Sequence, residues 1–215
     1  MDELVAWVHK AMRDGKDVAG YELELKTTVS KATFDTLTAK LFLPNCTLDM
    51  FGNGFRYTMA SGSECNSVQG CDGYKCITHV SVMSKKRLDK IASSNIRGTT
   101  NVEIIVTPST QCPHARIPTL IARQTKDTYF REKSRWSIMH DKYPVQLDLT
   151  RVRGRRGAEE VKEGDDTSYA TTYEVELEWC PQNTYITACS ASAFVSLFAS
   201  FMSHLSVETF RTDGI

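Results

Sequence analysis

The amino-acid sequence predicts a mainly β (α+β) fold, in which about eight antiparallel strands close into a barrel braced by helices near both ends of the chain. Three segments support this prediction. Residues 21–26 (Tyr-Glu-Leu-Glu-Leu-Lys) and 173–179 (Tyr-Glu-Val-Glu-Leu-Glu-Trp) alternate apolar and ionisable side chains, which is the period-two pattern of a β-strand. Residues 127–138 alternate in the same way with basic side chains. Each strand therefore has one apolar face and one charged face.

The remaining elements follow from the helical and strand periods. Amphipathic patterns predict three helices, over 2–13 with Asp2 as N-cap, over 31–42 with Ser30 as N-cap, and over 189–208. Further strands are expected at 48–60, 74–83, 100–107, 127–139, 144–152 and 169–179. The hydrophilic residues 153–168 predict a hairpin loop. The length fits one domain, 1–215.

The two acidic segments gather ionisable groups on one face, because residues two apart in a strand point the same way. These groups are Glu22, Glu24 and Lys26 in the first segment, and Glu174, Glu176 and Glu178 in the second. Two carboxylates about 7 Å apart repel each other by roughly 2 kcal/mol at an effective dielectric constant of ~20. Five of them together predict a hard divalent cation, Mg²⁺ or Mn²⁺. For either segment alone, the alternative is an ordinary solvated face of a sheet.

The middle strands add basic and hydrogen-bonding groups to the charged faces. These are Arg131, Lys133 and Arg135, followed by Gln146, Asp148 and Thr150. If the sheet closes, the polar faces line a tunnel, and eight strands leave room for side chains or one small ligand. Carboxylates with a metal on one wall and Arg or Lys on another suit a polyphosphate, which Arg binds as a planar fork and Lys as a point charge.

The patterned strands together resemble the triphosphate tunnel metalloenzymes, and most closely the metal-dependent mRNA 5′-triphosphatases of the fungal and protozoan type. The matching motifs are E-x-E-x-K at 22–26, Lys-x-Arg at 133–135, Asp-Leu-Thr at 148–150 and Glu-Val-Glu-Leu-Glu at 174–178. The resemblance spans roughly residues 20–180, and residues 45–120 match poorly. E-x-E-x-K alone is shared with thiamine-triphosphatase-like, tripolyphosphatase-like and adenylyl-cyclase-like relatives.

The resemblance implies a role for most of the polar-face residues. The implied metal ligands are Glu22, Glu24 and Glu178, with Glu176 and Glu174 acting through water or on a second metal. The implied phosphate contacts are Lys26, Lys133, Arg135, Arg56 and one of Lys85 and Lys86, of which Lys86 is assigned. The implied catalytic residues are Lys133, Arg135, Arg56, Asp148, Glu174, Glu176 and Glu103, the last as the best counterpart of a water-orienting glutamate. Gln146 departs from the family pattern, which usually has arginine there.

The implied activity is metal-dependent hydrolysis of the γ-phosphate of 5′-triphosphate RNA, which leaves a 5′-diphosphate end for mRNA capping, with NTPs as lesser substrates. Two alternatives stand beside it: a phosphatase acting on tripolyphosphate or thiamine triphosphate, and a non-catalytic β-barrel that binds polyphosphate or RNA. A guanylyltransferase is a candidate partner, and a monomer is favoured over an oligomer. The basic residues Arg151, Arg153, Arg155 and Arg156 are candidate RNA contacts from the expected loop.

Composition sets the outer bounds of these expectations. The net charge is zero, so no global field attracts RNA, although residues 116–156 are locally basic and 159–178 locally acidic. No apolar run approaches the ~20 residues of a membrane span, and the start of the chain has no apolar signal-peptide core. Seven cysteines, an odd number, favour free thiols in a reducing compartment. The expected location is the nucleus, or the cytoplasm for a viral protein.

Overall fold

The computed structural model describes residues 2–39, 45–52, 55–61, 77–93, 95–109, 129–156, 170–180, 188–203 and 210–211. The helices are α1 (Asp2–Gly15), α2 (Lys31–Thr38) and α4 (Ala191–Met202). The strands are β1 (Tyr21–Val29), β2 (Asn45–Gly52), β3 (Phe55–Ser61), β4 (Ile77–Ser93), β5 (Ile96–Ser109), β6 (Tyr129–His140), β7 (Val145–Arg156), β8 (Ala170–Trp179) and β9 (Phe210–Arg211). None of the described helices is both long and apolar enough to cross a lipid bilayer.

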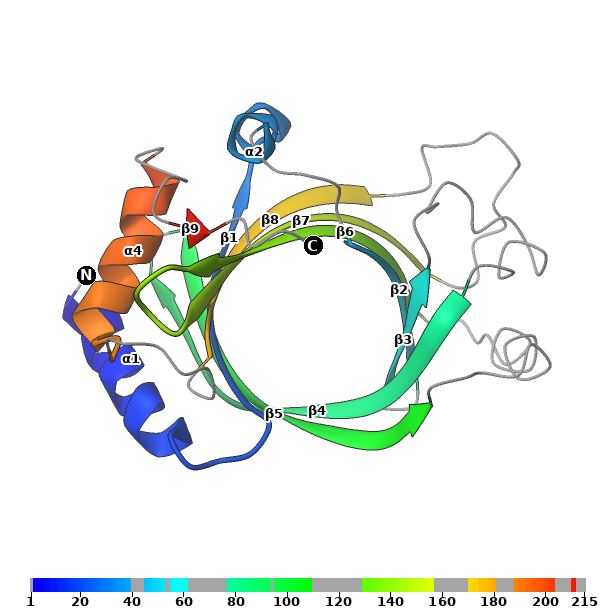
Figure 1. The fold of residues 1–215 in the computed structure, drawn as a ribbon, viewed down its shortest axis with the longest axis horizontal. Helices are drawn as coiled ribbons and strands as arrows, with labels where there is room; N and C mark the ends of the chain where they lie inside the picture. Colours follow the sequence, from blue (N-terminus) through cyan, green and yellow to red (C-terminus); the bar gives the residue numbers. More distant parts are fainter. Residues whose placement is uncertain are drawn as a thin grey trace.

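The strands form one antiparallel barrel, seen along its axis in Figure 1. Their order is β2-β3-β4-β5-β1-β8-β7-β6, and β2 also pairs with β6, which joins the two ends of the sheet. Strand β9 adds a short pairing at the end of β6. The two acidic strands, β1 and β8, are neighbours, with Glu24 opposite Glu178 and Lys26 opposite Glu176. The predicted closed antiparallel barrel is therefore confirmed.

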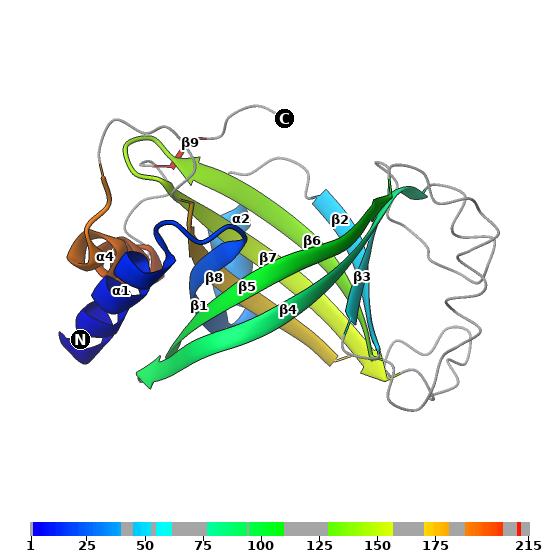
Figure 2. The same ribbon diagram turned by 90° about the horizontal axis from the view of Figure 1, so that it is seen from below.

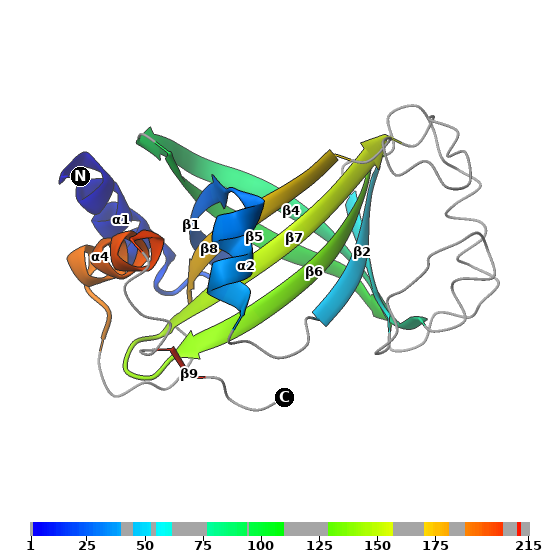
Figure 3. The same cartoon turned by 90° about the horizontal axis from the view of Figure 1, so that it is seen from above.

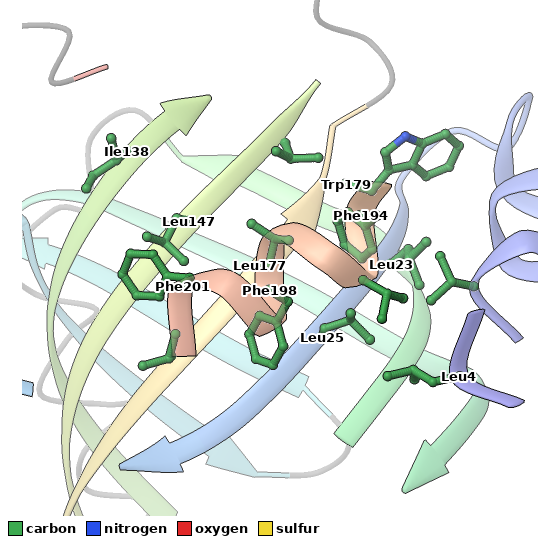
Figure 4. Close-up of a cluster of buried hydrophobic side chains, with 14 of the residues drawn as sticks. Leu4, Leu23, Leu25, Ile138, Leu147, Leu177, Trp179, Phe194, Phe198 and Phe201 are labelled. Carbon is green, nitrogen blue, oxygen red and sulfur yellow. The ribbon is translucent and has the colours of Figure 1, made fainter. Parts of the chain in front are cut away.

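The hydrophobic core lies outside the barrel, between its wall and the helices (Figure 4). The central residues of β1 and β8 that face away from the axis are fully buried, as are two phenylalanines of α4 in the same core. They include Leu23, Leu25, Val175, Leu177, Phe194 and Phe198. Leu4 and Val8 of α1 join the same core. The predicted bracing by N- and C-terminal helices is confirmed, and it leaves the charged faces directed into the barrel.

Helix α2 covers a second part of the outer wall, over β7 and β8 (Figure 3). Ser30 caps it as predicted, because its Oγ accepts a hydrogen bond from the Thr33 backbone N–H at 3.1 Å. The predicted N-cap Asp2 is instead the first residue of α1. The predicted helix ends at 40–42 and 204–208 lie outside the described residues.

Three strand predictions were wrong in their boundaries. The expected single strand 48–60 is the hairpin of β2 and β3. Residues 77–83 of the expected strand 74–83 are the first part of β4, which continues to Ser93 and forms a long hairpin with β5 (Figure 2), and residues 74–76 lie outside the described part of the chain. Residues 153–156, expected in a loop, extend β7, because they pair with residues 129–132 of β6.

Candidate active site

The barrel encloses a cavity of about 1020 Å³, and most of the described side chains that line it are charged. The acidic lining residues come from β1 and β8: Glu24, Glu174, Glu176 and Glu178. Among the lining residues that the structure describes, the basic ones outnumber the acidic ones two to one: Lys26 on β1, Arg131, Lys133 and Arg135 on β6, and Lys85, Arg87, Lys90 and Arg97 on β4 and β5. In Figure 1, β4 and β5 form the wall opposite β6 and β7, so the acidic strand β1 lies between two basic walls.

Lys26 binds two of the glutamates across the seam between β1 and β8. Its Nζ donates hydrogen bonds to Glu174 Oε2 at 2.5 Å and to Glu176 Oε1 at 2.6 Å. Burial lowers the pKa of Lys26, but attraction to these carboxylates outweighs it and the pKa is raised. Burial likewise raises the pKa of Glu176, but Lys26 and Arg135 together lower it to about 2. Glu176 is therefore a permanently charged group held between two cations.

Arg135 joins strands β6, β7 and β8 through three contacts. Its Nε donates to Thr150 Oγ1 at 3.2 Å, its Nη1 lies 3.0 Å from Asp148 Oδ2, and its Nη2 donates to Glu176 Oε2 at 3.2 Å. Asp148 is only 1% exposed, and burial raises its pKa in spite of Arg135. Gln146 donates to the other oxygen of Asp148 at 2.9 Å. Asp148 therefore binds the guanidinium of Arg135 and does not itself line the cavity.

Glu24 and Glu178 have a different environment from the other two acidic lining residues. They are direct partners across β1 and β8, and neither forms an ion pair with any residue that the structure describes. Burial, followed by repulsion from Asp148 and Glu22, raises the pKa of Glu178 to about 7. Burial and repulsion from Glu176 raise the pKa of Glu24. Such a pair of destabilised carboxylates is typical of a site for a cation.

The structure describes the side chains of some of the other predicted site residues and not those of the rest. The Glu22 carboxylate contacts the ammonium of Lys85, which lines the cavity, whereas the assigned phosphate contact Lys86 is not among the lining residues. The structure therefore favours Lys85 over Lys86. Arg56 lies in β3 and Glu103 in β5, opposite Lys85, but their side chains are outside the described part of the structure. Their predicted roles stay predictions.

Most of the basic wall formed by β4 and β5 was not predicted from the sequence, which indicated only Lys85 or Lys86 there. Arg87, Lys90 and Arg97 all line the cavity and are exposed to solvent. A register shift between Arg87 and Asp89 interrupts the strand alternation, so Arg87 and Lys90 reach the same side although they are three residues apart. The run of charged residues at 85–90 was the available sequence signal for this wall. The bulge interrupts the two-residue alternation by which that run would have been recognised as a strand face.

The basic residues of β7 lie elsewhere. Arg151 donates to Ser134 Oγ at 3.1 Å, and Arg153 forms a 3.7 Å ion pair with Glu132. Neither lines the cavity, and Arg153 belongs to β7 rather than to the expected loop 153–168. A role for them in RNA binding stays a prediction.

The raised pKa values of Glu178 and Glu24 predict a pH-dependent stability. At pH values between about 4.5 and about 7, the folded protein retains protons that the unfolded chain has released. The free energy of unfolding of the metal-free protein therefore falls as the pH rises through this range, by up to about 3 kcal/mol for Glu178 alone. Denaturant unfolding in EDTA at several pH values measures this slope. Glu178→Gln should remove most of it, and a wild-type slope of zero would contradict the prediction.

Comparisons with known proteins agree with this architecture. The sequence profile of the family described as "mRNA capping enzyme, beta chain" matches residues 78–198, more than half of the chain. No curated protein sequence matches the chain. A solved structure of the Mimivirus capping enzyme triphosphatase has a TM-score of 0.58 and 14% identity, and the match covers 95% of this chain and 98% of that chain. The RNA triphosphatase domain of the trifunctional mimivirus mRNA capping enzyme gives the same TM-score and identity, with 96% and 97% covered. At 14% identity, these two structures show only that the folds are alike. That fold is consistent with the match to the family profile. The chain belongs to the family of mRNA capping enzyme β chains.

Proposed function

We propose that this chain is a metal-dependent RNA 5′-triphosphatase, which hydrolyses the γ-phosphate of 5′-triphosphate RNA and leaves a 5′-diphosphate end for capping. The observation that carries the proposal is the cavity, in which the basic side chains of β6 lie beside a row of carboxylates. A polyphosphate chain and a divalent cation together would satisfy this charge distribution. Membership of the capping-enzyme family favours RNA as the carrier of the triphosphate.

The carboxylates of β1 and β8 fit the chemistry of Mg²⁺ or Mn²⁺. Glu24 and Glu178 are oxygen donors with raised pKa values, so a cation bound between them would relieve their repulsion. Glu22 is the expected third ligand. Among the described residues no three carboxylate, imidazole or thiol groups converge on one point, so Glu22 would have to exchange Lys85 for the ion. A cation held there would withdraw charge from the terminal phosphate and lower the pKa of a water molecule.

The basic residues of β6 would stabilise the charge that develops on the transferred phosphoryl group. Lys133 is 8% exposed, and its charge therefore acts in a poorly hydrated part of the cavity, where electrostatic interactions are stronger. Arg135 has five N–H donors, and its three contacts leave two for phosphate oxygens. Asp148 and Glu176 fix the orientation of this guanidinium before substrate binds.

A phosphate-release assay tests the proposal. The substrates are γ-labelled triphosphate RNA, ATP and tripolyphosphate, each with Mg²⁺, with Mn²⁺ and with EDTA. We expect release that requires the metal, the highest kcat/KM for RNA and lower values for ATP. A far higher kcat/KM for tripolyphosphate would favour the small-polyphosphate phosphatase. Binding of RNA without any hydrolysis would favour the non-catalytic barrel.

The product also suggests where the chain acts. A diphosphate RNA end is the acceptor that a guanylyltransferase caps, so such an enzyme is the expected functional partner. The corresponding location is the nucleus, or the cytoplasm for a viral protein.

A further inference from the structure

Besides Lys85, which is paired with Glu22, three exposed cations line the cavity on the described wall of β4 and β5: Arg87, Lys90 and Arg97. None of the three forms an ion pair with another residue that the structure describes. Lys26, in contrast, forms ion pairs with Glu174 and Glu176. Lys133 differs in being buried rather than exposed. Three cations that line a cavity and yet are hydrated mark the part of it that opens to solvent.

The strand register places these cations beside the carboxylates but at a distance from them. Arg87 pairs with Asn101 of β5, which pairs with Glu22 of β1. Lys90 pairs with Thr99 of β5, which pairs with Glu24 of β1. Two strand spacings correspond to about 10 Å between the backbones. The cations of β4 therefore lie on a different part of the barrel wall from the carboxylates, where they can contact a part of a bound chain other than the phosphate held at the carboxylates.

Arg97 extends this row toward the centre of the site. It is the direct partner of Lys26 across β5 and β1, and Lys26 is already occupied by two carboxylates. The cavity, at about 1020 Å³, lies at the upper end of the roughly 300–1,000 Å³ of pockets that enclose a whole small ligand. It has room for more than a triphosphate group.

We propose that Arg87, Lys90 and Arg97 form a binding subsite for the ribose-phosphate backbone that follows the triphosphate end of RNA. The inference rests on the proposed function, since it assumes that the triphosphate is held at the carboxylates and the basic wall of β6. Each phosphodiester carries one negative charge, and exposed cations bind such charges without regard to base sequence and in a salt-dependent way. The subsite would distinguish RNA from free nucleotides and from tripolyphosphate, because only an RNA chain is long enough to reach it.

The test is a triple variant, Arg87→Gln, Lys90→Gln and Arg97→Gln, compared with the wild type on three substrates. For triphosphate RNA of about ten nucleotides, we expect KM to rise about tenfold, with kcat unchanged. The slope of log(kcat/KM) against log salt should become shallower by about 2, since each single-strand phosphate contact contributes about 0.7. For ATP and tripolyphosphate, both parameters should stay within about twofold of the wild type.

A matched control removes three positive charges from exposed positions outside the cavity: Arg13→Gln, Lys16→Gln and Lys142→Gln. These side chains do not line the cavity. If this control weakens RNA turnover as much as the triple variant does, the effect is one of net charge and the subsite is wrong. An equal loss on tripolyphosphate in the triple variant also overturns it, because the three cations would then hold the triphosphate itself.

Binding of 5′-hydroxyl RNA separates the subsite from the proposed function. This RNA has the backbone and lacks the triphosphate, and its binding can be followed by fluorescence anisotropy. We expect weak, salt-sensitive binding to the wild type that the triple variant loses and the control retains. If wild-type protein cannot hydrolyse triphosphate RNA but still shows this pattern, the proposed function fails and the subsite stands. If the triple variant binds 5′-hydroxyl RNA as well as the wild type does, the subsite is overturned.

Discussion

Replacing Glu24 with glutamine should abolish phosphate release and make the folded protein more stable. The carboxylate is one of the two with raised pKa values and no ion pair among the described residues. Residues that merely support metal ligands typically change affinity or activity 10–100-fold, so loss of a ligand should lower kcat/KM by more than about a hundredfold. Removing one charge from a repelling cluster should raise the free energy of unfolding by about 1 kcal/mol. Phosphate release with saturating Mn²⁺ and denaturant unfolding in EDTA measure the two effects.

Glu174→Gln is the matched control for this prediction. Glu174 lies on the same charged face of the acidic strands and has the same side chain, but its Oε2 accepts a hydrogen bond from Lys26. The substitution should therefore lower the free energy of unfolding, in contrast to Glu24→Gln, because Lys26 loses a partner. Near wild-type activity of Glu24→Gln would rule out a metal ligand at this position. A loss of stability in both variants would contradict the division of the glutamates into two environments.

Replacing Arg135 with alanine should destabilise the fold by about 3–5 kcal/mol and remove activity. The change leaves Asp148 and Glu176, which are 1% and 7% exposed, without the guanidinium that they share. Arg135→Lys should restore stability in part, because an ammonium keeps the charge and loses the planar fork that spans three strands. Thermal or denaturant unfolding, together with phosphate release, measures both effects.

The double variant Arg135→Ala with Asp148→Asn separates charge from catalysis. Glu176 still has Lys26 as a partner, whereas Asp148 loses its cation, so neutralising Asp148 should recover part of the lost stability. Activity should not return, since the phosphate contact of Arg135 is still missing. An Arg135→Ala protein as stable as the wild type would show that the three-strand network contributes little.

Strict alternation is what made the first half of the site predictable. Glu22, Glu24 and Lys26 were placed on one face by their spacing alone, and Leu23 and Leu25 on the other, and both placements are correct. Lys133 and Arg135 were found in the same way. The sequence could not say that Lys26 would take Glu174 and Glu176 as partners, because that depends on the register of two strands distant in the chain.

The remaining half depended on features that local patterns do not encode. A bulge in β4 brings Arg87 and Lys90 to the same side and breaks the period that would have identified them. The boundary of β7 was wrong because Arg-Gly-Arg-Arg at 153–156 has the composition of a loop. Its extended form comes from pairing with β6, which is a tertiary constraint.

The pairing of β1 with β8 has a consequence for biosynthesis. Lys26 and Glu176, which face each other in the barrel, are 150 residues apart. At about 5–20 residues per second, one edge of β1 waits roughly 8–30 s after leaving the ribosome before its partner is translated. An unpaired strand edge with exposed Leu23 and Leu25 invites aggregation during that interval, and charged side chains on such an edge oppose it. We therefore expect the charges of Glu22, Glu24 and Lys26 to oppose aggregation of the nascent chain before the barrel closes.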